Sequence, residues 1–286
     1  MAKIGNVAID MSGAVKVMGI INASPESFYK RSVKKTKGEI AEAALQMESA
    51  GAALIDIGGM STAPYLETVV SAADEASRIK TAVSAAIESG CSLPISADTP
   101  RASVAQSAID AGALAINDVT GLKFDTKMAD VVASAGVSVI VGAYEPLGYT
   151  CGGKYSSTLA AIRRSITIAK AAGIRRSRIV VDPSIGFFRS EGKNPFFTRM
   201  VEMPWYLRDI DVLSNLEKLA AIAPVCVSVS AKSFLGHLLG IDRADDRLIP
   251  SLACEFYAAM KGARIIRTHN VKESVQALSM FEVLEG

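Results

Sequence analysis

The chain has 286 residues, of which 50% are apolar and 21% charged, a composition that excludes a disordered protein and suffices for a large core. Its 31 lysines and arginines against 29 aspartates and glutamates leave a net charge of +2, and no basic run exceeds two residues, so no nucleic-acid partner is expected. No apolar stretch approaches the roughly 20 residues of a membrane span, so we expect a cytoplasmic protein with no membrane partner.

Eight short runs rich in apolar and β-branched residues predict strands. In chain order they are 15–21, 54–57, 93–96, 114–116, 138–141, 178–181, 225–229 and 265–267. Alanine-rich segments with helical spacing follow them, at 39–50, 69–88, 103–111, 127–135, 159–172, 213–222, 252–261 and 272–280. Strand and helix therefore alternate along the whole chain.

Continuously apolar strands are typical of a parallel sheet that helices cover on both faces. Eight strand–helix units in about 250 residues fit a closed (β/α)₈ barrel better than an open sheet. Several predicted helices end at a glycine, which adopts the left-handed conformation of a helix C-cap at little cost: Gly51, Gly112, Gly136, Gly173 and Gly262. We predict an α/β protein, a single TIM-barrel domain over residues 1–286, with a doubly wound open sheet as the alternative.

The polar residues that end the predicted strands are the candidate site, because barrel active sites lie at the C-terminal ends of the strands. In chain order they are Asn22, Asp56, Asp98, Asn117, Asp182, Lys232, Arg267 and His269. Carboxylates and an amide at one half of this mouth suit the N–H edge of a planar, nitrogen-rich heterocycle. Cations from the last two strands at the other half are expected to meet a phosphate or diphosphate.

Each of these residues also has a structural explanation when taken singly. Aspartate and asparagine cap helices, Lys232 and Arg267 could be solvated charges, and His269 could simply enter a helix. The joint pattern across six strands favours a shared site. No Gly-x-Gly-x-x-Gly or P-loop pattern is present, so no local signal predicts a dinucleotide cofactor or a triphosphatase.

Seven motifs in this chain resemble the signatures of dihydropteroate synthases, in the family's order and spacing. They are MGIINASPESF (18–28), DIGGMST (56–62), SADT (96–99), INDV (116–119), VDPSIGF (181–187), SAKSF (230–234) and RTH (267–269). The resemblance implies a pterin-binding barrel that joins 6-hydroxymethyl-7,8-dihydropterin diphosphate to an arylamine and releases diphosphate with the help of Mg²⁺. It also implies a homodimer.

The resemblance further implies roles for individual residues. Lys232, Arg267 and His269 would be catalytic, with Arg267 and His269 on the departing diphosphate. Asn22 would help to place Mg²⁺, an ion that prefers oxygen ligands and phosphate. The implied substrate-binding residues are Asp56, Thr62, Asp98, Asn117, Asp182, Phe187 and Lys232.

The chain also departs from the family pattern. The family has a glutamate, an arginine and a second arginine where this chain has Met60, Ala63 and Ala231. The first loop continues with Tyr-Lys-Arg-Ser (29–32) instead of Ser-Asp-Gly-Gly, and the fifth strand ends in Gly-Ala-Tyr-Glu (142–145). Two expected cations are therefore missing from the side that would hold the arylamine, while the pterin edge is intact.

Three functions remain open on these residues. Lys30, Arg31 or Arg189 are candidates to replace the missing charge, and an arylamine that carries a phosphate, as in methanopterin-type pathways, would explain a rebuilt acceptor side. A pterin-dependent methyltransferase acting on a corrinoid protein would use the same pterin edge without a diphosphate clamp. A non-catalytic pterin-binding protein is the third alternative.

Overall fold

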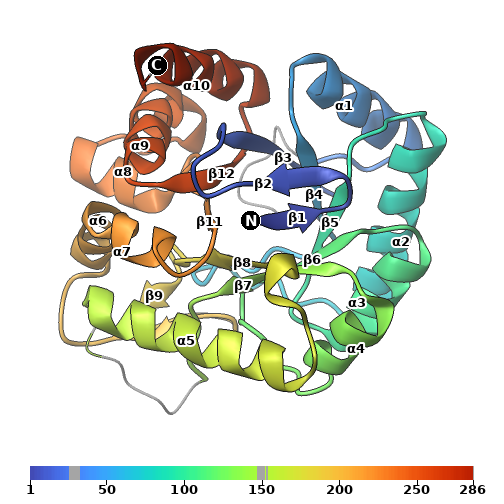
Figure 1. Cartoon of the computed structure of the whole chain (residues 1–286), viewed down its shortest axis with the longest axis horizontal. Helices are drawn as coiled ribbons and strands as arrows, with labels where there is room; N and C mark the ends of the chain where they lie inside the picture. The colour runs from blue at the N-terminus through green and yellow to red at the C-terminus, as the bar shows by residue number, and fades with distance from the viewer. Residues whose placement is uncertain (26–32, 147–151, 153, 286) are drawn as a thin grey trace.

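A computed structural model of the chain describes residues 1–25, 33–146, 152 and 154–285. Eight parallel strands form a closed barrel in the order β11-β12-β3-β4-β5-β6-β7-β8 (Figure 1). Their bounds are β3 (Lys16–Asn22), β4 (Leu54–Gly58), β5 (Ile95–Asp98), β6 (Ala115–Asp118), β7 (Ser138–Gly142), β8 (Ile179–Asp182), β11 (Val225–Val227) and β12 (Ala263–Thr268). Each overlaps a predicted strand, so the barrel is confirmed and the open sheet is wrong.

Helices surround the barrel on the outside (Figure 1). They are α1 (Lys37–Ser49), α2 (Ala72–Glu88), α3 (Ala102–Asp110), α4 (Met128–Ala135), α5 (Tyr155–Ala171), α6 (Trp205–Ser214), α7 (Leu216–Ala220), α8 (Ser233–Leu239), α9 (Leu248–Met260) and α10 (Val271–Glu285). The five predicted C-cap glycines all have positive φ, as at Gly136 after α4. Within the described residues no helix is long and apolar enough to cross a membrane.

An N-terminal hairpin covers the N-terminal end of the barrel, a feature that the sequence analysis did not predict. It consists of β1 (Ala2–Ile4) and β2 (Val7–Ile9). Ile4 and Ile9 are buried against apolar side chains of the barrel interior, among them Met18 and Ile140. Burial of this kind contributes about 1.5–3 kcal/mol per large side chain. The hairpin therefore closes this end of the barrel with buried apolar side chains.

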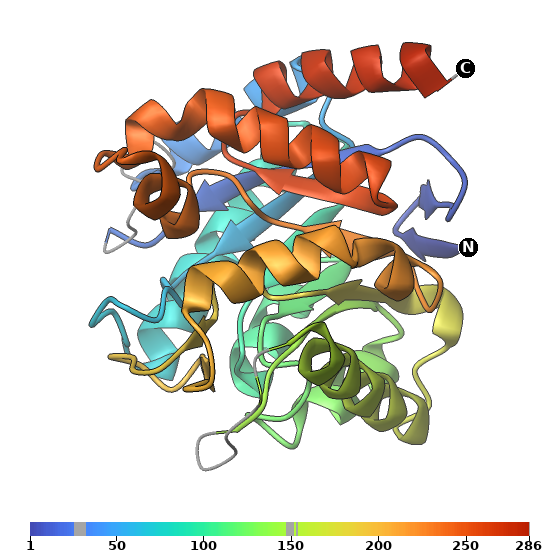
Figure 2. The same cartoon turned by 90° about the vertical axis from the view of Figure 1, so that its left-hand side faces the viewer.

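Two long loops extend from the opposite end of the barrel (Figure 2). The loop after β8 carries the short parallel pair β9 (Phe188–Arg189) and β10 (Thr198–Arg199). Its Asn194 donates from Nδ2 to the Ala63 carbonyl over 2.7 Å, and the Lys193 amide donates to the Pro64 carbonyl over 2.7 Å. These bonds tie the loop after β8 to the loop after β4, and both reach the mouth of the barrel.

Candidate active site

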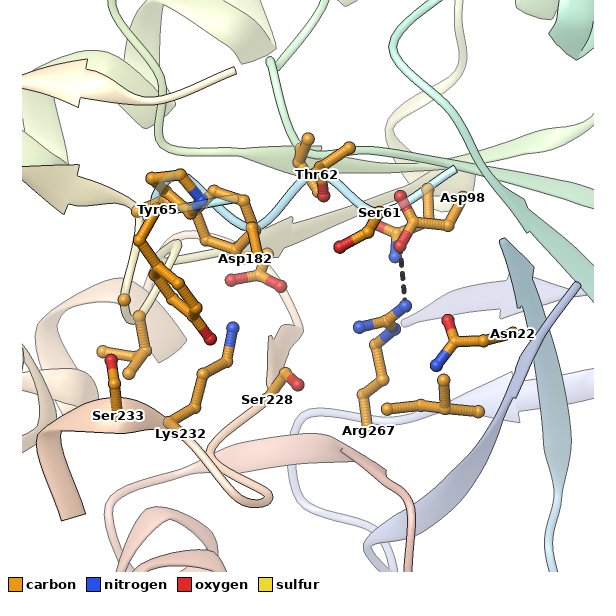
Figure 3. Close-up of a pocket in the computed structure, with 18 of the residues that line it drawn as sticks. Asn22, Ser61, Thr62, Tyr65, Asp98, Asp182, Ser228, Lys232, Ser233 and Arg267 are labelled. Atoms are coloured by element: carbon orange, nitrogen blue, oxygen red, sulfur yellow. Dashed lines mark hydrogen bonds and ion pairs between the residues drawn. The ribbon is translucent and has the colours of Figure 1, made fainter. Parts of the chain in front are cut away.

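A pocket lies at the C-terminal ends of the barrel strands (Figure 3). Nine of the predicted site residues line it: Asn22, Thr62, Asp98, Asn117, Asp182, Phe187, Lys232, Arg267 and His269. As the strand ends predicted, the fold brings together side chains from β3, β5, β6, β8 and β12 and from the loops that follow β4, β8 and β11. The polar lining also includes Ser61, Tyr65, Ser228 and Ser233, which the sequence analysis did not name.

Arg267 ties the carboxylates of two other strands together. Its Nε donates to Asp56 Oδ2 over 2.6 Å, and its Nη2 donates to Asp98 Oδ2 over 2.7 Å. Asn117 Nδ2 donates to the same Asp56 oxygen over 2.9 Å. The sequence predicted two separate halves of the mouth, one that binds a heterocycle and one that binds an anion. The structure does not separate them, since the cation of β12 lies among the carboxylates.

Asp56 lies behind the pocket wall. It is completely buried and is not among the lining residues, although its neighbours Asn117 and Arg267 are. Its Oδ2 accepts from both of these neighbours. The structure thus gives Asp56 the task of positioning the amide and the guanidinium.

Three buried acceptor oxygens of this network lack a partner among the described residues. They are Asp56 Oδ1, Asp98 Oδ1 and Asn117 Oδ1. A buried acceptor without a hydrogen bond costs about 1–3 kcal/mol, and more when it is charged. Asp98 and Asn117 line the pocket, so a ligand with a donor edge would supply the N–H groups that their oxygens need, whereas Asp56 Oδ1 lies behind the wall.

Burial shifts the protonation of this network. It raises the pKa of Asp98 to about 7, although the neighbouring Arg267 guanidinium acts in the opposite direction. Burial also lowers the pKa of His269 to about 3, and the charges of Arg267 and Lys232 lower it further. His269 is therefore a neutral imidazole at pH 7, where the sequence alone predicted a cation. Its Nδ1 lies 3.1 Å from Ser230 Oγ.

Asp182 and Lys232 face each other across the pocket (Figure 3). Asp182 Oδ1 accepts the backbone N–H of Ser184 over 2.6 Å, and burial raises its pKa. Burial lowers the pKa of Lys232 to about 8, against the attraction of the Asp182 carboxylate. Lys232 Nζ lies 4.7 Å from the centroid of the Phe187 ring, within the range of a cation–π contact. A planar ligand would therefore meet an aromatic face, an ammonium and a carboxylate.

A buried ion pair on α6 fixes the loop that carries Phe187. Arg208 and Asp209 are both completely buried, and their side chains are 3.1 Å apart. Arg208 donates to the carbonyls of Pro183 and Ser184, and Asp209 Oδ1 accepts the Gly186 amide over 3.1 Å. The sequence pattern predicted no helix over these residues, because a polar pair does not mark a buried helix face.

Comparison with known proteins identifies the family of this barrel. A family model described as pterin binding enzyme matches residues 18–269. The chain is 31% identical over 284 residues to the dihydropteroate synthase of Clostridium beijerinckii, and the match covers 99% of this chain and 98% of that one. The chain belongs to the dihydropteroate synthase family.

Solved structures of the family share the whole fold. The Xanthomonas albilineans dihydropteroate synthase with 4-aminobenzoic acid superposes with a TM-score of 0.82 at 28% identity, covering 96% of this chain and 94% of that one. The same enzyme in complex with 7,8-dihydropteroate gives a TM-score of 0.79 at 27% identity, covering 97% and 95%. The resemblance of the seven motifs is therefore confirmed at the level of the family and the fold.

The departures from the dihydropteroate synthase pattern lie at different places around the pocket. Ala63 and Met60 line it in the loop after β4, whereas Ala231 is buried outside the lining. Of the three cations named above as replacements, Lys30 and Arg31 lie outside the described residues. Arg189 does line the pocket.

The pocket residues suit Mg²⁺ only if the substrate supplies some of the ligands of the ion. No group of three or more histidine, cysteine or acidic side chains in the described part of the chain could hold a metal ion. Asn22 offers one amide oxygen at the end of β3, where it lines the pocket. Because Mg²⁺ keeps several waters and is often held by one or two protein oxygens plus substrate phosphates, this single donor fits a site that a diphosphate completes.

Proposed function

We propose that this protein condenses 6-hydroxymethyl-7,8-dihydropterin diphosphate with an arylamine and releases diphosphate. The observation that carries the proposal is the pair of unpartnered buried oxygens on Asp98 and Asn117, two residues that line the pocket. The aminopyrimidine edge of a pterin presents adjacent N–H groups, and a carboxylate or an amide oxygen accepts such groups well. Family membership and the pterin and arylamine named for the Xanthomonas albilineans complexes support the same substrates.

The reaction exchanges one bond to the pterin methylene carbon for another. The C–O bond to the diphosphate breaks, the arylamine nitrogen forms a C–N bond, and the nitrogen loses a proton. The barrier falls if the negative charge on the leaving group is stabilised in a site that excludes water. Arg267 and Lys232 supply positive charge, and the neutral His269 supplies a hydrogen bond.

Asn22 would hold Mg²⁺ together with the diphosphate. The ion would neutralise part of the charge of the leaving group. The other side chains position the pterin: Asp98, Asn117 and Asp182 toward its N–H edge, with Phe187 and Lys232 toward the ring. Thr62, in the loop after β4, would contact the substrate from the opposite wall.

The test is release of diphosphate from the pterin diphosphate with Mg²⁺, with and without p-aminobenzoate or its phosphoribosylated analogue. We expect release that depends on the arylamine and falls by at least about a hundredfold in Lys232→Ala, because positioned charge in a closed site contributes several kcal/mol to the rate. Lys170→Ala, on the exposed face of α5, is the matched control.

Two results of this assay would contradict the proposal. Tight pterin binding without release would favour the methyltransferase or the non-catalytic binding protein. Release at the same rate with no arylamine would indicate a hydrolase.

The same assay tests the identity of the acceptor. Equal rates with plain p-aminobenzoate and the phosphoribosylated arylamine would count against a dedicated phosphate-bearing acceptor.

We propose a homodimer in solution, formed through the face of α8, α9 and α10. These helices lie together on one side of the barrel (Figure 2) and expose large apolar side chains, among them Leu239 at 58%, Ile249 at 73% and Met260 at 58%. Large apolar side chains exposed on neighbouring helices are typical of an interface. Light scattering tests this proposal, with Ile249→Glu expected to give a monomer.

A further inference from the structure

Arg189 is a buried cation for which the described residues provide no anion. The residue is only 7% exposed, yet it forms none of the ion pairs found among the described residues. Asp209 contributes to its electrostatic environment, but the Asp209 carboxylate pairs with Arg208 and accepts the Gly186 amide instead. Because an uncompensated buried charge is costly, a cation kept in such a place calls for a ligand of opposite charge.

The guanidinium is held in place by neutral partners. Nη2 donates to Ser233 Oγ over 2.8 Å, and Cζ lies 3.5 Å from the centroid of the Trp205 ring. Nη1 is buried and has no hydrogen-bond partner among the described residues. Stacking on an aromatic face and one hydroxyl acceptor orient the planar fork without neutralising it.

Arg189 lies at the end of the pocket that is remote from Asp98. Ser233, its hydrogen-bond partner, directly follows Lys232 at the start of α8. Figure 3 shows Tyr65 and Ser233 at one end of the pocket and Asp98 and Arg267 at the other, with the end of the Lys232 side chain and Asp182 between them. Arg189 itself lines the pocket. Arg189 therefore lies at the end of the pocket that the arylamine would occupy when the pterin is bound at the carboxylate end.

The loop after β4, which is bonded to the loop that carries Arg189, has lost charge. Ala63 lines the pocket in the loop after β4, and Asn194, five residues after Arg189, donates to the Ala63 carbonyl over 2.7 Å. The two loops are thus joined where the family pattern has an arginine and this chain has alanine. The loop after β4 lacks the cation, while the loop after β8 provides one.

We infer that Arg189, together with Ser233, binds the anionic group of the arylamine and makes this protein select acceptors with a carboxylate or phosphate remote from the amine. The inference rests on the proposed function. A guanidinium fork matches the paired oxygens of a carboxylate or phosphate, whereas an uncharged amide cannot use both donors in the same way. Arg189 is a specificity-determining residue in this account.

A binding comparison tests the inference without requiring turnover. Pteroate and its uncharged carboxamide are titrated by calorimetry into the wild type, Arg189→Gln and Arg199→Gln. Arg199 lies on β10 of the same loop, is exposed, and serves as the matched control. We expect the wild type and Arg199→Gln to prefer pteroate by about tenfold to a hundredfold, the range of a charge-assisted hydrogen bond. Arg189→Gln should bind both ligands about equally.

Turnover measurements distinguish an acceptor that carries a carboxylate from one that carries a phosphate. The KM for p-aminobenzoate and for a phosphoribosylated arylamine should each rise by about tenfold or more in Arg189→Gln, with the KM for pterin diphosphate unchanged. Whichever acceptor has the larger kcat/KM in the wild type is the preferred one. Arg189→Lys keeps the charge without the fork, so it should recover part of the preference and also guards against loss of folding in the glutamine variant.

The outcomes distinguish the inference from the proposed function. A wild type that binds pteroate and its carboxamide equally, or an Arg189→Gln variant that keeps the preference, overturns the inference and leaves the synthase proposal standing. A wild type that binds neither ligand overturns both. Pteroate selection by Arg189 in a protein that does not release diphosphate would support the inference about the ligand and refute the synthase.

Discussion

The two ends of the pocket hold their charges in opposite ways. At one end, Arg267 lies between the carboxylates of Asp56 and Asp98, so positive and negative charge are paired inside the protein and acceptor oxygens are left over. At the other end, Arg189 is held by a hydroxyl and an aromatic ring, and a donor is left over. The first end suits a ligand rich in N–H groups, and the second suits an anion.

This difference separates what the chain shares with its relatives from what is its own. The motifs at the carboxylate end follow the dihydropteroate synthase pattern, whereas the acceptor end carries Ala63 where the family has an arginine. In the proposed function, recognition of the pterin and recognition of the arylamine would therefore depend on different side chains. Variants at one end should leave binding at the other largely intact, since residues without shared partners act independently.

The largest expected effect is at Arg267. Arg267→Met would leave Asp56 and Asp98 buried together without their cation, and we expect the free energy of unfolding to fall by about 3–5 kcal/mol. Urea denaturation measures this loss. Arg264→Met, on the same strand but bonded through Nε to the exposed Met11 carbonyl, should lose no more than about 1 kcal/mol. Equal losses in the two variants would mean that the carboxylate end does not depend on Arg267.

Asp182→Asn should weaken binding of the pterin without weakening the fold. The amide keeps an oxygen for the Ser184 N–H but turns its second acceptor into a donor that faces the ring N–H groups. We expect the Kd for 7,8-dihydropterin, measured by calorimetry, to rise by about ten- to a hundredfold. Asp130→Asn, exposed on α4, is the control. An unchanged Kd would remove Asp182 from the site.

The protonation of Asp98 predicts a pH dependence that belongs to the carboxylate end alone. Because burial raises its pKa to about 7, the carboxyl is mostly protonated below that pH and accepts N–H groups poorly. Pterin affinity should therefore increase with pH, by up to about tenfold per unit below 7, and level off above it. Asp98→Asn should bind weakly and lose the rise centred near pH 7, keeping only the changes that come from Asp182, whose pKa burial also raises, and from Lys232, whose pKa is about 8. A wild-type profile with the same shape as that of the variant would contradict this assignment.

The smallest expected effect is at Tyr65, which lines the acceptor end. Burial raises the pKa of its hydroxyl, so it stays a neutral hydrogen-bonding group at pH 7. Tyr65→Phe should raise the KM for the arylamine by about two- to tenfold, the range of a neutral hydrogen bond, and leave the pterin Kd unchanged. A larger change in the pterin Kd than in the arylamine KM would show that the two ends are not separable.

The barrel and most of its site residues could be predicted because their signals are local. Each strand is a short apolar run that ends in a polar residue, and parallel strands bring those ends to one mouth. The hairpin of β1 and β2 was missed because its strands have three residues each, too few to show a period. Helix α6 was missed because Arg208 and Asp209 are buried on it through pairing with each other.

The interactions among the site residues could not be predicted in the same way. Asp56 was expected at a strand end like Asp98, but it is the third of the five residues of β4, so its side chain lies deeper in the barrel, where Asn117 and Arg267 both donate to its Oδ2. The neutrality of His269 depends on burial and on nearby cations, and neither is visible in the sequence. Strand ends predict which residues meet, while their hydrogen bonds decide what each one does.

A crystal structure of the protein with bound 7,8-dihydropteroate tests the two-ended pocket most directly. The account predicts that ring N–H groups lie within about 3.2 Å of oxygens of Asp98, Asn117 and Asp182, while the carboxylate lies within the same distance of Arg189 and Ser233. A ligand bound in the reverse direction, or a carboxylate directed at solvent away from Arg189, would contradict it.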